Sequence, residues 1–129
     1  MAKNVSREDE KKIVARLVER VRGRLNEAEQ HLEKYQKRFA EDPADALEWS
    51  EGVFGDAMRI RLYKAFLRAF DESAKIDDIR EYRDGYLHKT MMTHVLSPAR
   101  STSACANIMS DAHARECARL IDLMDGCCV

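Results

Sequence analysis

VARLVERVRGRLNEAEQHLEKYQKRF, residues 14–39, decides the fold class, because its apolar residues recur with the period of an α-helix. They are separated alternately by four and three residues over nearly four heptads, a spacing typical of a coiled-coil seam. The seam consists of Val14, Val18, Val21, Leu25, Ala28, Leu32, Tyr35 and Phe39. Ile13 and Leu17 widen the apolar face in its first half. The pattern therefore predicts one long amphipathic helix.

The length of this helix raises the question of what covers it. Ser6 followed by Asp9 predicts a capping box at its start. About 33 residues would extend ~50 Å, whereas a compact chain of this size has a radius of gyration of ~14 Å. The helix either bends near Gly23 or projects from the fold and meets a partner. We expect a second copy, which makes the protein a homodimer. The alternative is a long hairpin packed on the chain's own later helices. The expected self-association residues are Val18, Val21, Leu25, Leu32 and Tyr35.

Capping residues divide the rest of the chain into further helices. Asp42 and Pro43 predict a helix start, Gly52 predicts its end, and Asp56 predicts the cap of a helix over 57–71. The next helix opens at Ser73 or Asp77 and runs to about residue 96, with Gly85 as a candidate kink and Ser97-Pro98 as its end. The last helix covers about 103–125, with a Ser or Thr before it as N-cap and Gly126 as terminator.

These elements predict an all-α fold, a bundle of four to five helices with a long N-terminal coiled-coil-like helix. We expect a single helical domain over residues 1–129, with 1–5 disordered and 126–129 as a frayed tail. The chain has only 5 Gly and 2 Pro and shows no strand-like alternation of apolar and polar residues. Both features argue against a β-sandwich or β-barrel.

Composition and charge limit the classes of function. A net charge of −1 excludes a globally basic nucleic-acid binder, although not a local basic patch. No apolar run approaches the ~18–20 residues of a membrane span, and the first residues lack the apolar core of a signal peptide. We therefore expect a cytoplasmic protein with four reduced cysteines and no membrane contact. The terminal GCCV is not a prenylation box, because Gly126 stands where the cysteine is required.

The stretch MSDAHARECARLIDLM, residues 109–124, contains the one arrangement that resembles a metal site. His113 and Cys117 lie one helical turn apart, and residues 88–129 hold three of the four His, four of the six Met and all four Cys. Such soft ligands suit Zn(II) or Cu(I). The candidate ligands are His113, Cys117, Met109 and His94. The favoured interpretation is a closely packed core helix in which His113 donates a hydrogen bond to a nearby carbonyl or carboxylate.

A stripe of cations marks the helix predicted over 57–71. Arg61, Lys64 and Arg68 recur at i, i+3 and i+7, opposite the aromatic residues of the same helix. We expect this stripe to bind a partner. Such a stripe also suits the phosphates of a nucleic acid. The further alternatives are a solvated face and a docking surface for the acidic segments 41–56 and 71–84.

Catalysis is the weakest interpretation of the sequence. A nucleophile needs a base within reach and an orienting third group, and His113 with Cys117 has neither a glycine-rich loop nor evident oxyanion donors nearby. We therefore expect a non-catalytic helical interaction protein, a regulator, adaptor or inhibitor that binds a macromolecular partner, most simply a protein, and associates with itself. A nucleic-acid-binding regulator using the stripe on 57–71 is the first alternative. A soft-metal or thiol-redox sensor using His113 and Cys117 is the second.

Overall fold

The computed structural model describes residues 7–97 and 100–129, and within these residues the chain is helical with no β-strand. The helices are α1 (Arg7–Glu41), α2 (Pro43–Leu47), α3 (Ser50–Ala69), α4 (Ile76–Tyr82), α5 (His88–Leu96) and α6 (Ala104–Gly126), with a π-helical turn, η1 (Arg83–Leu87), between α4 and α5. The predicted all-α bundle with a long first helix is confirmed. No helix in the described residues is both long enough and apolar enough to cross a membrane.

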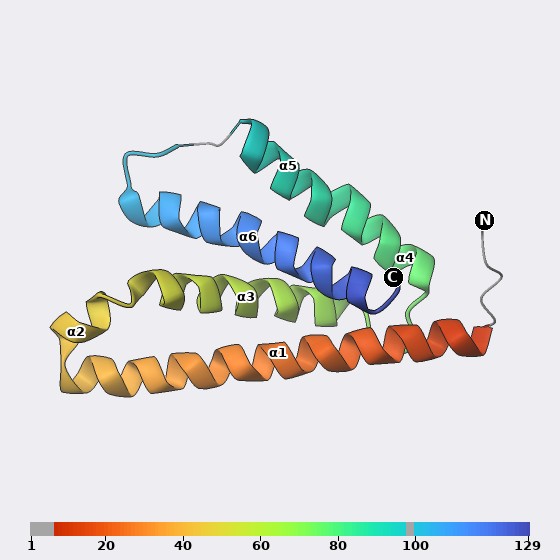
Figure 1. The fold of residues 1–129 in the computed structure, drawn as a ribbon, viewed down its shortest axis with the longest axis horizontal. Helices are drawn as coiled ribbons and strands as arrows, with labels where there is room; N and C mark the ends of the chain where they lie inside the picture. Colours follow the sequence, from red (N-terminus) through yellow and green to blue (C-terminus); the bar gives the residue numbers. More distant parts are fainter. Residues whose placement is uncertain (1–6, 98–99) are drawn as a thin grey trace.

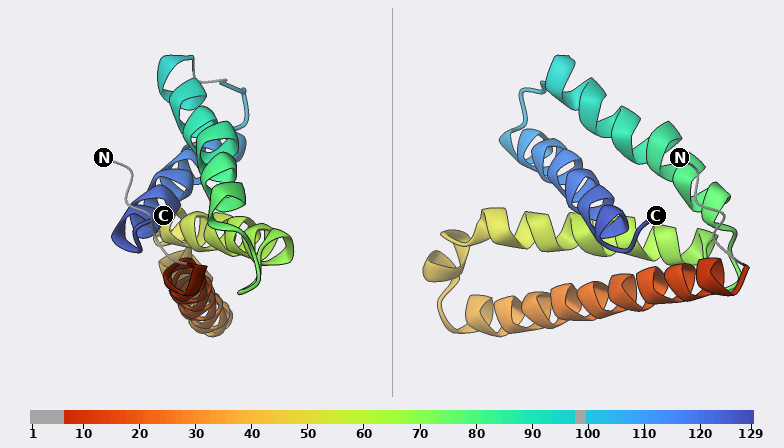
Figure 2. Two further views of the ribbon diagram at one scale, coloured as in Figure 1. Left: turned by 90° about the vertical axis from the view of Figure 1, so that its right-hand side faces the viewer. Right: turned by 45° about the vertical axis from the view of Figure 1, so that its right-hand side comes forward.

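The helices are stacked in layers, with α1 on one outer side and α5 on the other (Figure 1). α3 runs antiparallel to α1 and lies between α1 and α6, while α6 lies between α3 and α5 (Figures 1 and 2). Because α6 packs on both of its neighbours, it has more buried residues than any other helix of the described residues. The core is formed by residues of α3 and α6 with α1, α4 and η1, including Leu17, Tyr63, Phe66, Ile79 and Leu120.

The helix α1 is one unbroken rod of 35 residues, about 52 Å long. It continues through Gly23, where no other part of the chain lies within 4 Å of an added Cβ. Its first half packs on α3 and the core. This half of α1 therefore forms a hairpin with the chain's own later helices, as the alternative interpretation of the sequence expected. Val18 and Val21 are fully buried there, whereas Phe39 at the far end is exposed.

The junction between α2 and α3 differs from the prediction. Asp42 caps α2 by accepting a hydrogen bond from the Asp45 amide, and Pro43 is its first residue, as expected. The predicted helix end at Gly52 and new cap at Asp56 are wrong, because α3 begins at Ser50 and passes through both positions. Gly55 is buried in this helix, with Arg115 of α6 alongside. Packing against α6 and the bonding of a continuous helix outweigh the weak helix propensity of two glycines.

The helix expected up to residue 96 ends at Leu96 as predicted, with Ser97 as its C-cap. The irregularity near Gly85 is a π-helical turn, which inserts one extra residue into the helix and rotates the side chains of the next turn about the helix axis. Leu87 at its end is fully buried, so the turn directs this side chain into the core while α5 continues outward.

The last helix begins as predicted and ends differently. The Ser103 hydroxyl accepts a hydrogen bond from the Ala106 amide, which makes Ser103 the N-cap. Beyond Gly126 the chain forms a Schellman motif, in which the amide of Val129 donates to the Met124 carbonyl and Cys128 takes the left-handed conformation with φ of 66°. Gly126 is therefore not the terminator, and the predicted frayed tail is wrong. Cys127 and Val129 are buried in the core. The capping box at Ser6 and the disorder of residues 1–5 lie outside the described residues.

Candidate functional site

The His113–Cys117 pair does not present a metal or redox site. Cys117 is fully buried in the core, and burial raises the pKa of its thiol to about 11, so it stays protonated at neutral pH. His113 is half-buried, and its Nε2 lies 3.4 Å from the Tyr86 hydroxyl, not beside a carbonyl or carboxylate. Burial lowers the pKa of His113, and the charges of Arg61 and His94 lower it further.

The other two predicted ligands are also engaged elsewhere. The Nε2 of His94 lies 2.9 Å from Oδ1 of Asp111, and its Nδ1 lies 3.5 Å from the Ser110 hydroxyl. Met109 is half-buried on α6. Over residues 7–97 and 100–129, no group of three or more His, Cys, Asp or Glu is placed to hold a metal ion. The four residues proposed as ligands therefore do not form the expected site.

These histidines instead line a groove of about 510 Å³ between α5 and α6. Its lining is rich in hydroxyl groups, with one lysine and no carboxylate, and includes Tyr86, Lys89, Thr90, Thr93, His94, Ser110 and His113. Polar side chains thus line the space between α5 and the rest of the fold. The groove separates α5 from α6 and gives the outer helix little apolar burial.

The amphipathic character of α5 is consequently reversed. None of its residues is fully buried, and its polar residues Thr90 and Thr93 face the groove. Its apolar residues lie on the other side, where Val95 is 67% exposed and Leu96 is 76% exposed, with Met92 also exposed. A surface helix normally turns this stripe inward, so the outer face of α5 is an apolar surface that the other described residues leave uncovered.

A second apolar surface lies at the tip formed by the end of α1, α2 and the start of α3 (Figure 1). Leu47 is 61% exposed and Trp49 is 55% exposed, with Phe39 close to half exposed. The Arg38 guanidinium lies 5.3 Å from the centroid of the Trp49 ring and 3.1 Å from Asp45, which orients both aromatic and cation. Tyr35 and Phe39 form a ring pair on the adjoining face of α1. Sequence reasoning missed Leu47 and Trp49, whose exposure depends on the break between α2 and α3.

The predicted self-association residues divide into two groups. Val18 and Val21 are buried within the chain, and Leu25 is partly buried against the same core. Leu32 and Tyr35 are partly exposed nearer the tip. The first group is therefore engaged with the chain's own helices, and only the second group adjoins a surface that another molecule can reach.

The cationic stripe is exposed on α3, as the periodicity indicates. Arg61, Lys64 and Arg68 are all exposed, and none forms an ion pair with another described residue. Arg68 donates a hydrogen bond to the Lys64 carbonyl. Arg61 is close enough to His113 to lower the pKa of its imidazole. The stripe thus adjoins the α5–α6 groove and is available to an anionic partner.

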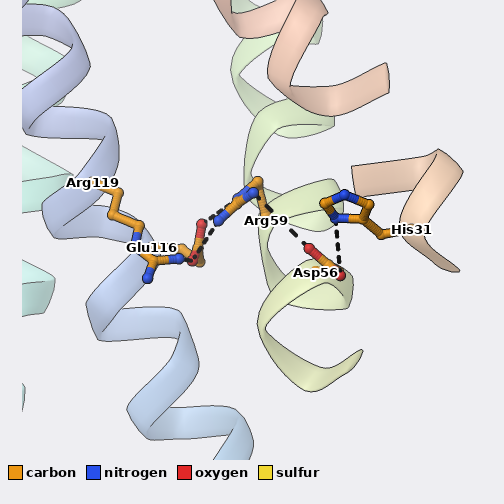
Figure 3. A network of polar contacts seen from close by, with 5 residues as sticks. All are labelled: His31, Asp56, Arg59, Glu116 and Arg119. Atoms are coloured by element: carbon orange, nitrogen blue, oxygen red, sulfur yellow. Dashed lines mark hydrogen bonds and ion pairs between the residues drawn. The ribbon is translucent and has the colours of Figure 1, made fainter. Parts of the chain in front are cut away.

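A network of charges centred on a buried carboxylate joins α1, α3 and α6 (Figure 3). Glu116 of α6 is completely buried, and its carboxylate accepts hydrogen bonds from Arg59 at 2.6 and 3.4 Å and from Arg119 at 2.8 Å. The bond to Glu116 raises the pKa of Arg59. Asp56 lies 3.9 Å from Arg59 and 3.6 Å from His31, which extends the network to α1.

Sequence reasoning missed this network because its main partners are 57 residues apart. Glu116 falls about 100° from Cys117 around the helix, at the edge of the predicted apolar face. The sequence offered one hint of this pairing, a carboxylate at the edge of the apolar face in a chain that also has an arginine-rich helix over 57–71. Because the hydrogen-bonding oxygens of Glu116 are taken up by arginines, the network joins helices and leaves no unpaired carboxylate for a ligand.

Comparison with known proteins adds no identification. No protein-family model, curated protein or solved structure matches the chain. The functional conclusion therefore depends on the two uncovered apolar surfaces, the cationic stripe and the charge network themselves.

Proposed function

We propose that this chain is a non-catalytic helical interaction protein, a regulator, adaptor or inhibitor that binds a protein partner through its uncovered apolar surfaces. One observation carries the proposal. The large apolar side chains that are exposed in the described residues occur mainly in two places: Phe39, Leu47 and Trp49 at the tip, and Met92, Val95 and Leu96 on the outer face of α5, whereas the exposed Tyr86 lines the α5–α6 groove. Clustered exposure of this kind marks interaction surfaces.

The residue types support a protein partner. Trp, Met and Arg are enriched in protein–protein interfaces, and Trp and Arg dominate binding hot spots. The tip presents Trp49 with Arg38 stacked on its ring, and α5 presents Met92. Each large apolar side chain that becomes fully buried on binding contributes about 1.5–3 kcal/mol.

The chemistry of the polar groups supports a role without catalysis. The thiol of Cys117, which lies one helical turn from His113, has its pKa raised to about 11 by burial, the reverse of what activates a nucleophile. The carboxylate of Glu116 is bound by two arginines. All four cysteines are free thiols, which suits the reducing cytoplasm where we place the protein.

A nucleic-acid-binding regulator is a second candidate, favoured by the exposed stripe. Arg61 and Lys64 are exposed and form no ion pair with another described residue. Binding of a labelled RNA or DNA duplex, followed by fluorescence anisotropy, tests this candidate. Affinity that falls steeply with salt and is lost in Arg61→Glu/Lys64→Glu/Arg68→Glu supports it. An equal and negligible signal for both proteins contradicts it.

The protein-partner proposal is tested by cross-linking in the cells that make the chain, followed by reconstitution with the purified partner. Trp49→Ser removes the tip anchor, Val95→Ser removes an anchor on α5, and Lys37→Ser is a matched control on the exposed side of α1. We expect Trp49→Ser or Val95→Ser to weaken binding at least about tenfold, as hot-spot substitutions do, with the control unchanged. Partners whose affinity depends on neither surface would contradict the proposal.

A further inference from the structure

The two apolar surfaces differ in charge: the tip is mainly acidic, with its Arg38 paired to Asp45, whereas α5 carries one lysine, Lys89, and no carboxylate. The segment 41–56, which contains α2 and the start of α3, has six acidic residues and no basic one. The segment 85–110, which contains α5, has no acidic residue and includes Lys89 and Arg100, of which Arg100 is paired with Asp111 of α6 at 3.0 Å.

Glu48 at the tip and Lys89 on α5 are exposed, and neither forms an ion pair with another described residue. Lys89 lies at the edge of the α5–α6 groove and also borders the apolar face, because Met92 and Leu96 follow it by three and seven residues.

We infer that each surface is the partner of the other on a second copy of this chain, so that the tip of one copy docks on the outer face of α5 of the next. This inference depends on the proposed function and names the partner. Leu47 and Trp49 would pack against Val95 and Leu96, which covers the most exposed apolar residues of both surfaces.

Charge selects this pairing over the two symmetric ones. A tip against a second tip brings the acidic segments 41–56 together, and an α5 against a second α5 brings Lys89 beside its own copy. Like charges across an interface oppose association, whereas opposite charges favour it and speed the encounter. The tip on α5 is the arrangement in which Glu48 and Asp42 of one copy approach Lys89 of the other.

The positions of the two surfaces make the contact head to tail. The tip lies at one end of the α1–α3 hairpin, and α5 lies on the opposite outer layer, with α3 and α6 between them (Figure 2). The two surfaces of a single chain are therefore not in contact, and one copy offers both to its neighbours. A contact between unlike surfaces produces either a closed ring or an open chain of copies.

Complementary variants give a direct test. Leu47→Glu/Trp49→Glu disables the tip, and Val95→Glu/Leu96→Glu disables α5, at positions exposed enough for the fold to be kept. Molar mass is measured by sedimentation from micromolar to millimolar concentration, with helicity checked by circular dichroism. We expect the unmodified chain to form assemblies larger than a monomer. Each variant alone should be a monomer, and an equimolar mixture should stop at a one-to-one dimer, because it retains one intact tip and one intact α5.

A charge exchange provides a second measurement that leaves the apolar residues in place. Glu48→Lys alone and Lys89→Glu alone should each weaken assembly by about fivefold at low salt, the upper range for an exposed pair. The rescue experiment mixes two chains. One carries Glu48→Lys on an intact tip and has its α5 disabled, and the other carries Lys89→Glu on an intact α5 and has its tip disabled. Because the reversed charges again attract each other, this pair should bind as tightly as the same pair without the charge changes.

The remaining outcomes overturn the inference in distinguishable ways. A tip variant that stays monomeric while the α5 variant still dimerises indicates tip-to-tip pairing, and the mirror result indicates α5-to-α5 pairing. A chain that is monomeric up to millimolar concentration removes the second copy as partner. The proposed function is then tested separately, by whether Trp49→Ser and Val95→Ser weaken the binding of a different protein.

Discussion

Replacing Arg59 by Met should destabilise the fold strongly, because it leaves the buried carboxylate of Glu116 with a single partner. Glu116 is completely buried, while the Arg59 side chain is 18% exposed and supplies two of its three hydrogen bonds. Breaking a buried ion pair from one side costs about 3–5 kcal/mol. Arg119 remains bound at 2.8 Å, so we expect the lower end of that range, about 3 kcal/mol.

The matched comparison is Arg119→Met. The side chain of Arg119 is 48% exposed, so water and salt screen its contact with Glu116. We expect a loss of only about 1 kcal/mol or less, as for other half-exposed pairs. A double variant, Arg59→Met/Glu116→Leu, removes both charges and should recover stability to within about 1 kcal/mol of the unmodified chain, because an apolar replacement of a buried pair is often neutral.

The assay is urea unfolding followed by circular dichroism, which is preferable to fluorescence because Trp49 is exposed in the folded protein. A loss of about 3 kcal/mol corresponds to a fall in Tm of about 10 °C for a domain of this size. Equal losses for Arg59→Met and Arg119→Met would refute the assigned roles. A double variant as unstable as Arg59→Met would show that the loss arises from altered packing and not from an unpaired buried charge.

Three further predictions address separate parts of the fold. Gly23→Ala should raise the free energy of unfolding by about 0.5–1 kcal/mol, because the position is helical and open around its Cα; an unchanged or lower urea midpoint would contradict this. The pKa of His113 is lowered in the folded chain by burial and then by Arg61 and His94, so the unfolded chain binds more protons as pH falls below ~6.5. Stability should therefore decrease over that range, and Tm measured against pH should decrease less steeply in His113→Gln; parallel curves would exclude this contribution. A thiol reagent should modify exposed Cys105 at least about 100-fold faster than Cys117, whose pKa is raised to about 11 by burial; comparable rates by mass spectrometry would place Cys117 at the surface.

Local signals in the sequence were reliable where one short-range interaction decides the outcome. Asp42 and Ser103 each cap a helix by accepting a hydrogen bond from an amide three residues ahead. The sequence alone identifies Asp42 and limits the second cap to a Ser or Thr before the last helix. Gly126 shows the limit of the same reasoning. The left-handed residue is Cys128, because the apolar Cys127 and Val129 are drawn into the core and set where the chain turns.

The candidate site depended on the tertiary structure to a greater degree. The sequence placed His113 and Cys117 on the apolar face of a helix and favoured a packed core helix, in keeping with the buried thiol. The packing of α6 between α3 and α5 decided that His113 faces Tyr86. The exposure of Val95 could not be predicted, since the apolar residues of α5 have the pattern of an ordinary buried stripe. Which side of a helix faces the core depends on the helices around it.

The sequence by itself determined that this chain is a helical bundle, that its first helix is long, and that α3 carries an exposed stripe of cations. Each of these follows from the 3.6-residue period, which orders the side chains of one helix without reference to the rest of the chain. The tertiary structure alone decided that Arg59 pairs with Glu116 across 57 residues, and that the tip and the outer face of α5 stay uncovered. Contacts between distant segments depend on how whole helices pack, and no local pattern encodes that arrangement.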